Sequence, residues 1–135
     1  MIYTKRLITI RNTTASIDAP VILYRGDKEV EIIFEIIDSK FKFESSSGNL
    51  IDNSHAAYGQ MVIACPNGSN IISNVMECEN GLITFVMTTS MMDELTEVGE
   101  YSFQIRLFND TKTSRITLPI VVNGIEVKEP IVANW

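Results

Sequence analysis

Apolar and polar residues alternate along most of this chain, and that period of two constrains the fold more than any other feature. In the segment 30–37 every second residue from Val30 is apolar, and Glu31 and Glu35 fall between them. The segment 101–107 repeats the pattern. Neighbouring side chains on a strand point to opposite faces, so both segments are predicted to be strands with one buried face.

Turn residues divide the rest of the chain into further short strands. Strand-like segments are expected at 2–11, 20–25, 58–65, 71–79, 82–87 and 116–122. Asn80-Gly81 supplies the positive φ angles that a two-residue hairpin needs, so Gly81 is predicted to be a structural residue. Residues 38–57 are polar and are expected to form a long loop with a short strand at 41–44.

About eight short strands with almost no helix predict an all-β fold, an immunoglobulin-like antiparallel β-sandwich. One short helical turn is expected near 90–95, with Ser90 as its capping residue. Pro119 cannot donate a ladder hydrogen bond, so the last strand should be bulged or at an edge there. We assign residues 1–123 to the sandwich and residues 124–135 to a C-terminal extension or a linker to a missing portion.

The segment that leads into the strand at 101–107 has the pattern of a tyrosine corner. An acid, a glycine and a tyrosine stand at alternate positions, as Glu97, Gly99 and Tyr101. The Tyr101 hydroxyl is expected to hydrogen-bond to backbone a few residues upstream. Phe103 occupies the position at which antibody domains have a cysteine, so hydrophobic packing should replace the disulfide between the sheets. Gly99, Tyr101 and Phe103 are therefore predicted to be structural residues.

The charge of the chain argues against several classes of partner. Its 17 acidic and 11 scattered basic residues give a net charge of −6, so binding to nucleic acid or to anionic membranes is not expected. No apolar run approaches the ~18 residues of a membrane span and no targeting segment is recognisable, so we expect folding in a cytoplasm. Cys65 and Cys78 are expected to be free buried thiols, with a disulfide as the alternative.

No set of residues has the spacing of a catalytic, metal or cofactor site. His55 is the only histidine and no C-x-x-C pair occurs, so a zinc site is not expected. Glu31 and Glu35 would lie roughly 13 Å apart along one strand, which is too far for a glycosidase pair. The glycines are isolated and form no phosphate-binding loop. We therefore predict that the protein is not an enzyme and takes no cofactor.

Two features point to protein partners. Ile131, Val132 and Trp135 form an apolar C-terminus, and tryptophan is favoured at interface centres, so these residues are predicted to bind a partner. The alternative is that they pack on their own sandwich. The second feature is a set of methionines that could either fill the core or form an adaptable contact surface: Met76, Met87, Met91 and Met92.

An ordered series of segments also carries information, although none of them is specific alone. The series is an opening strand at 2–11, Leu23-Tyr24-Arg25-Gly26-Asp27, a strand at 30–37, Tyr58-Gly59-Gln60-Met61-Val62-Ile63 leading to Pro66-Asn67-Gly68, Gly81-Leu82-Ile83-Thr84-Phe85, and Gly99-Glu100-Tyr101-Ser102-Phe103. In order and spacing this series resembles the N-terminal domain of the phage baseplate upper protein (BppU) family over nearly the whole chain.

The resemblance implies a structural role in the virion, in a phage tail assembled in the host cytoplasm. In that family the N-terminal domain anchors to the tail hub at the distal tail protein ring. The remainder of the family's chain trimerises and carries the receptor-binding proteins. This chain stops at Trp135 without that portion, so we expect an excised domain or a shortened member, and self-association stays open.

The alternative function is a carbohydrate-binding β-sandwich module of a phage tail or cell-wall-associated protein. Such a module needs coplanar aromatic side chains exposed along one face. The chain offers Trp135 and four tyrosines for this purpose.

Overall fold

A computed structural model describes residues 3–11, 14–37, 42–44, 50–52, 56–113 and 115–131 of the chain. Within these residues nearly all regular structure is strand, so the predicted all-β fold with one short helical segment is confirmed. The described residues form thirteen strands, against about eight expected. In chain order the elements are β1 (Tyr3–Arg11), β2 (Thr14–Ile17), β3 (Val21–Tyr24), β4 (Val30–Ile37), β5 (Lys42–Glu44), β6 (Leu50–Asp52), β7 (Tyr58–Ala64), β8 (Asn70–Ile72), β9 (Met76–Glu79), β10 (Leu82–Met87), α1 (Thr89–Asp93), β11 (Gly99–Phe108), β12 (Arg115–Thr117) and β13 (Val121–Lys128).

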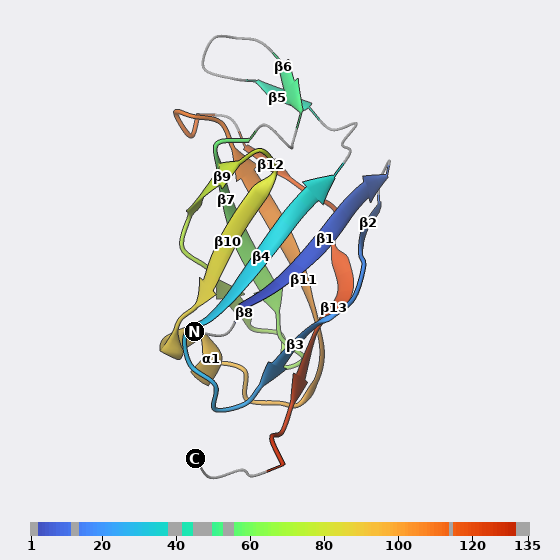
Figure 1. The fold of residues 1–135 in the computed structure, drawn as a ribbon, viewed down its shortest axis with the longest axis vertical. Coiled ribbons are helices and arrows are strands. Elements are labelled where there is room, and N and C mark those ends of the chain that lie inside the picture. The colour runs from blue at the N-terminus through green and yellow to red at the C-terminus, as the bar shows by residue number, and fades with distance from the viewer. Residues whose placement is uncertain are drawn as a thin grey trace.

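Eleven of these strands form one continuous sheet that curls into two facing layers (Figure 1). The order is β2-β1-β4-β10-β9-β7-β11-β13-β3, with β8 on β7 and β12 on β11. We call the half with β1, β4 and β10 layer A, and the half with β7, β11 and β13 layer B. Strand β9 pairs with both layers. Strands β5 and β6 pair with each other at one end of the molecule.

Two pairs of strands run parallel, whereas the sequence predicted an antiparallel sandwich. Strand β4 lies parallel to β1, with Ile36 beside Ile8, and β3 lies parallel to β13, with Val21 beside Ile125. A parallel neighbour requires a long crossover connection. The crossover from β1 to β4 contains β2, which the sequence did not reveal, and β3, which pairs in layer B. The chain therefore forms β3 in layer B before β4 pairs with β1 in layer A.

The core lies between the two layers and follows the alternation seen in the sequence. Along β4 the residues from Val30 alternate between buried and half-buried. Three phenylalanine rings meet across the layers: Phe34 stacks on Phe103 with 5.1 Å between ring centroids and meets the edge of Phe85 at 6.0 Å. Each ring contributes about 1.5–3 kcal/mol by leaving water. These contacts tie β4 and β10 to β11.

The strand predicted at 71–79 is divided into β8 and β9. Between them Ser73 is buried, and its hydroxyl accepts a hydrogen bond from the Met61 backbone N–H at 2.8 Å. A serine hydroxyl that bonds to backbone competes with the strand ladder and ends it. Both β8 and β9 run antiparallel to β7, and across Ser73 the register of their pairing with β7 shifts by one residue.

The last predicted strand, 116–122, is likewise divided, and Pro119 lies in the break between β12 and β13. The alternation of the sequence puts Ile116, Leu118, Ile120 and Val122 on one face, but this pattern ends at the break, because Val121 is buried while Val122 is 70% exposed. Strand β13 then continues to Lys128, paired with β11 and β3, so the predicted sandwich boundary at residue 123 falls inside this strand.

The short helix begins two residues earlier than its predicted cap implied. Thr88, not Ser90, is the N-cap, because its backbone is extended and its hydroxyl accepts a hydrogen bond from the Met91 N–H at 3.3 Å. Met91 and Met92 are buried, as is Met87, so these three fill the core. Only Met76 of the four methionines is partly exposed.

Candidate functional site

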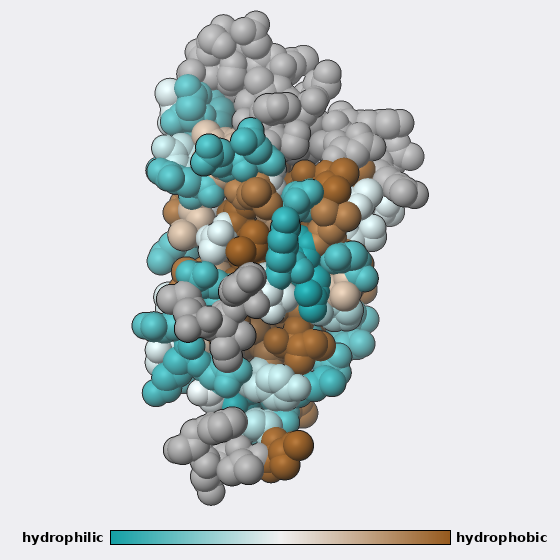
Figure 2. Space-filling model, in the orientation of Figure 1, coloured by the Kyte–Doolittle hydropathy of each residue, from teal (hydrophilic) through white to brown (hydrophobic). Residues whose placement is uncertain are grey.

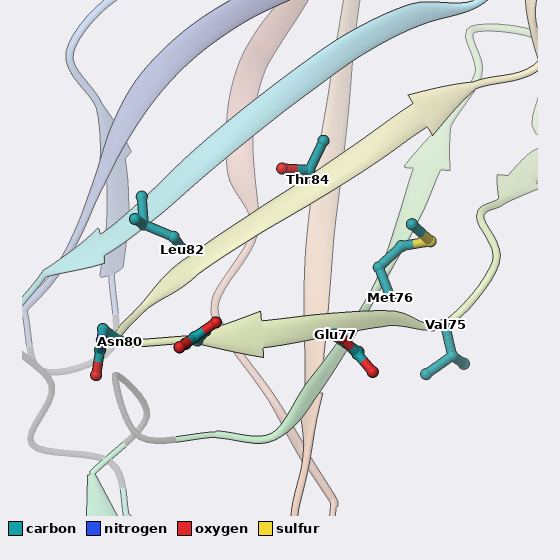
Figure 3. A pocket seen from close by; sticks show the side chains of 7 residues that line it. Val75, Met76, Glu77, Asn80, Leu82 and Thr84 are labelled. Carbon is teal, nitrogen blue, oxygen red and sulfur yellow. The ribbon is translucent and has the colours of Figure 1, made fainter.

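A groove of about 590 Å³ separates β9 from β10 over part of their length (Figure 3). The two strands diverge from their shared turn, and side chains of both strands line the opening between them. Apolar and acidic residues occur together here. The lining residues are Val75, Met76, Glu77, Glu79, Asn80, Leu82 and Thr84.

The groove exists because β9 changes its partner along its length. Cys78 and Glu79 pair with β10, whereas Met76 and Glu77 pair with β7 in layer B. Beneath it, Gly59 of β7 brings the layers close together. A Cβ atom at Gly59 would lie only 2.6 Å from Ile83 Cδ1, so a side chain there would force the end of the Ile83 side chain to shift.

The turn between β9 and β10 fixes where the groove begins. Asn80 has a φ of 52° and Gly81 a φ of 79°, which is the two-residue turn with positive φ at both positions. The hairpin expected from Asn80-Gly81 is thus present, with Glu79 opposite Leu82. The Gly81 carbonyl accepts a hydrogen bond from the Ile36 N–H at 2.8 Å, which joins the turn to β4.

The groove is acidic on its outer side and apolar beneath. Glu77 and Glu79 are exposed and have no ion-pair partner among the described residues, and no basic residue lines the groove. Cys78 lies between them and is buried, and burial raises the pKa of its thiol to about 11, against a smaller lowering by a backbone hydrogen bond at Gly81. A thiol with this pKa stays protonated at neutral pH and is a poor nucleophile.

The tyrosine corner is formed by Glu97 and Tyr101. The Tyr101 hydroxyl donates a hydrogen bond to the Glu97 carbonyl at 2.7 Å and accepts one from the Glu97 N–H at 3.3 Å, which is the bond the sequence predicted. Tyr101 is buried, and burial raises the pKa of its hydroxyl. Gly99 has a φ of 132°, a conformation that favours glycine. Phe103 follows in the core, stacked on Phe34.

A second hollow lies where the chain leaves the sheet near its C-terminus. It is lined by Arg25, Gly26, Met92, Asp93, Leu95 and Glu129. The Arg25 guanidinium and the Glu129 carboxylate form an ion pair across it. Ile131, one of the predicted partner-binding residues, follows with its side chain fully exposed. Val132 and Trp135 lie outside the described residues.

Apolar side chains are also exposed on the outer face of layer B. Ile72 of β8 lies directly opposite Val62 of β7, and Ile72, Ile120 and Val122 are each at least half exposed. Val62 and Ile120 line a shallow hollow with Gln104 between their strands. Exposed apolar groups that lie close together on one face are typical of protein contact sites.

The outer face of layer A has a different character (Figure 2). Hydrophobic and hydrophilic groups alternate over β1, β4 and β10, because each row of the sheet places a charged residue beside an apolar one. Lys5 lies beside Ile33, and Glu35 beside Leu7. The Lys5 ammonium pairs with the Glu35 carboxylate at 3.3 Å. This face therefore neutralises part of its own charge.

The described residues hold no cluster of three His, Cys, Asp or Glu side chains that could bind a metal ion. His55 lies outside them. Cys65 and Cys78 are free and buried, as the sequence predicted. Of the aromatic side chains whose exposure the structure describes, only Tyr24 is strongly exposed. In the same part of the chain, no helix has the length and hydrophobicity to cross a membrane.

The sequence predicted the tyrosine corner and the hairpin at Asn80-Gly81, but it did not reveal the groove between β9 and β10. The corner and the turn are local patterns within a few residues. The groove depends on the pairing of β9 with two different strands, which no local pattern reports. The available signals were Ser73, which interrupts an apolar run, and Gly59, which interrupts a strand.

No protein-family model matches the chain, and no curated protein sequence matches it. Its fold is similar to a solved structure, the N-terminal domain of phage TP901-1 ORF48, with a TM-score of 0.58. The similarity covers 95% of this chain and 99% of that chain, at 13% sequence identity. At this level of identity the likeness shows a shared fold.

Proposed function

We propose, from the fold shared with the N-terminal domain of a phage protein, that this chain is a structural protein of a phage tail baseplate. In this proposal it anchors the receptor-binding apparatus to the tail hub by protein–protein contact. The observation that carries the proposal is the fold similarity over 95% of the chain. The order and spacing of segments in the sequence support the same function independently.

The proposed partners are the distal tail hub protein and, through a further portion of the assembly, a receptor-binding protein. The proposed location is the virion. Stable protein complexes bury about 800 Å² on each partner around an apolar centre. The outer face of layer B supports this function, since Ile72, Ile120 and Val122 expose apolar area there without neighbouring ion pairs in the described residues.

We also propose that the chain has no catalytic activity. Catalysis by side chains requires a nucleophile, a base or an acid held within hydrogen-bond reach of each other. Here the Cys78 thiol has a raised pKa, and Glu35 is paired with Lys5. These groups lie on different faces of the sheet, and none of the three hollows combines them.

The test is association with the purified hub protein encoded by the same genome, measured by size-exclusion chromatography with light scattering. We expect a complex of defined stoichiometry that survives an increase in NaCl from about 0.1 to 0.5 M, because apolar contacts are not screened. Separate elution of the folded chain and the folded hub protein would contradict the proposal.

A matched pair of variants sharpens this experiment. Val122→Asp places a charge on the outer face of layer B, and Val98→Asp places the same charge at a similarly exposed position near the tyrosine corner. We expect Val122→Asp alone to weaken the complex, by at least about tenfold. Equal affinities for both variants would remove the outer face of layer B from the interface.

The same sample decides against the alternative function. Calorimetric titration with host cell-wall glycans should show no heat of binding, because Tyr24 is the one strongly exposed aromatic side chain among those whose exposure the structure describes, and it cannot form a platform alone. Saturable glycan binding together with failure to bind the hub protein would replace the proposal with a carbohydrate-binding module.

A further inference from the structure

Strand β10 has an open edge inside the sheet, next to the groove. On one side it pairs with β4 along its whole length, from Leu82 to Met87. On the other side its pairing with β9 ends at Ile83, which lies opposite Cys78. Within the part of the chain that the structure describes, no strand takes the place of β9 beyond that point.

The alternation of hydrogen bonds shows which backbone groups face this edge. The Ile36 N–H donates to the Gly81 carbonyl, so in the antiparallel ladder Ile83 and Phe85 also bond toward β4. The backbone N–H and C=O of Thr84, which lines the groove, and of Val86, one residue beyond Phe85, consequently point to the open edge. An open edge of this kind is a template for a strand from another chain.

Other strands also have an open side in the described sheet. Strands β2, β3, β8 and β12 have only three or four residues each. Short edges are a usual means by which proteins prevent unwanted pairing. The open part of β10 runs from Thr84 to Met87 and is no longer than these edges, but β4 pairs with all of it on the other side and the groove lies beside it at Thr84 (Figure 3).

The chemistry of the groove indicates what kind of strand would enter. Glu77 and Glu79 are on the exposed side of β9, since Cys78 between them is buried. Met76 and Val75 supply an apolar surface next to them. A strand in the groove would place alternate side chains toward the carboxylates and toward these apolar groups. Basic residues alternating with apolar ones complement both sides.

We propose that the groove between β9 and β10 binds an extended, basic segment of a partner protein as an added strand on β10. Main-chain hydrogen bonds to Val86 would supply affinity, and the Glu77 and Glu79 carboxylates would select for lysine or arginine at alternate positions. This strand-addition site does not depend on which protein is the hub. Failure of the chain to bind the hub protein would therefore not contradict it.

The experiment uses the full chain and a capped peptide of about six residues in which lysine alternates with valine. Binding is followed by nuclear magnetic resonance as shifts of backbone amide signals. We expect the shifts to centre on Val86 and on residues 75–79. The same peptide with N-methyl groups on alternate nitrogens cannot form the ladder, and it should bind at least about tenfold more weakly.

Charge is tested separately, with a matched control. Glu77→Lys and Glu79→Lys should each weaken peptide binding about three- to tenfold at low salt, whereas Glu100→Lys, an equally exposed position on layer B, should leave it unchanged. A peptide with glutamate in place of lysine should not bind.

Three results would overturn the proposal. The first is unchanged affinity after N-methylation, which would exclude strand addition. The second is equal loss for Glu100→Lys and Glu79→Lys, which would reduce the effect to net charge. The third is a dimer of the free chain that the peptide dissociates, since this would assign the edge to a second copy of the chain.

Discussion

The tyrosine corner and the β9–β10 groove are both places where the chain changes its course at a sheet, but they satisfy their polar groups differently. At the corner, the Tyr101 hydroxyl bonds to both backbone groups of Glu97, so the chain completes its own hydrogen bonds. At the groove the Glu77 and Glu79 carboxylates have no partner among the described residues, and the Val86 backbone has none at the adjoining open edge of β10. The corner therefore serves folding, and the groove is available for binding.

The largest expected effect tests the core that both regions share. Phe103→Ala removes the ring that stacks on Phe34 between the layers, and it should lower the free energy of unfolding by about 3–5 kcal/mol. Val122→Ala, an exposed position on a neighbouring strand, should change it by less than about 0.5 kcal/mol. Urea denaturation measures both. Similar values for the two variants would show that the stacked rings do not hold the layers together.

The next effect concerns the buried side of the groove. The Cys78 thiol has a pKa of about 11 in the folded chain, against an ordinary value of 9.0. Between these pH values the unfolded chain loses the proton while the folded chain keeps it, so rising pH favours unfolding. This group's contribution is complete below pH 9 and is lost as pH rises toward 11, at a cost of about 2–3 kcal/mol.

Cys78→Ala isolates this contribution, because the substitution removes this one titratable group and changes no other. The difference in unfolding free energy between the wild type and the variant should narrow from pH 8.5 to pH 11, a window that spans both pKa values. A difference that stays constant would mean that the thiol is accessible to water, and that the groove reaches deeper than the structure shows.

A smaller effect is expected at the tyrosine corner. Tyr101→Phe removes the hydroxyl and leaves the Glu97 carbonyl and N–H without their partner, so stability should fall by about 1–2 kcal/mol. The change in urea midpoint gives the value. An unchanged urea midpoint would show that water replaces the hydroxyl as the hydrogen-bond partner of Glu97. The corner would then not differ from the groove in completing its own hydrogen bonds.

The smallest effect on stability is expected in the groove itself. Glu79→Lys removes an exposed carboxylate without a partner, so the free energy of unfolding should change by less than about 0.5 kcal/mol. Thermal denaturation is sufficient to detect a larger change. A loss as great as that of Tyr101→Phe would assign Glu79 a structural role and weaken the case for a binding surface.

The sequence predicted those parts of the molecule that local patterns determine. Alternation gave the bounds of β4 and β10, because each has one face in the core. The hydrogen bond between Tyr101 and Glu97 joins residues four positions apart, and the Asn80-Gly81 turn joins two consecutive strands. In each case the residues that decide the structure are close together in the chain.

The remainder depended on pairings between distant segments. Strand β2 has no fully buried residue and exists because it pairs with β1, so its alternation was too weak to recognise. Pro119 separates β12 from β13. After this break the alternation is out of step with the sequence pattern, so Val121 is buried and Val122 is exposed. The groove requires β9 to pair with both layers. Gly59 and Ser73 allow this pairing, but neither residue predicts it from the sequence.

The most direct test of the open edge is hydrogen exchange of two adjacent amides in β10, measured on the free chain. The Phe85 N–H bonds toward β4, whereas the Val86 N–H points to the open edge of β10, although the same strand carries both. We expect Val86 to exchange about a hundredfold faster than Phe85. Equal protection of the two amides would show that the edge is already occupied, and it would contradict the assignment of the groove as a binding site.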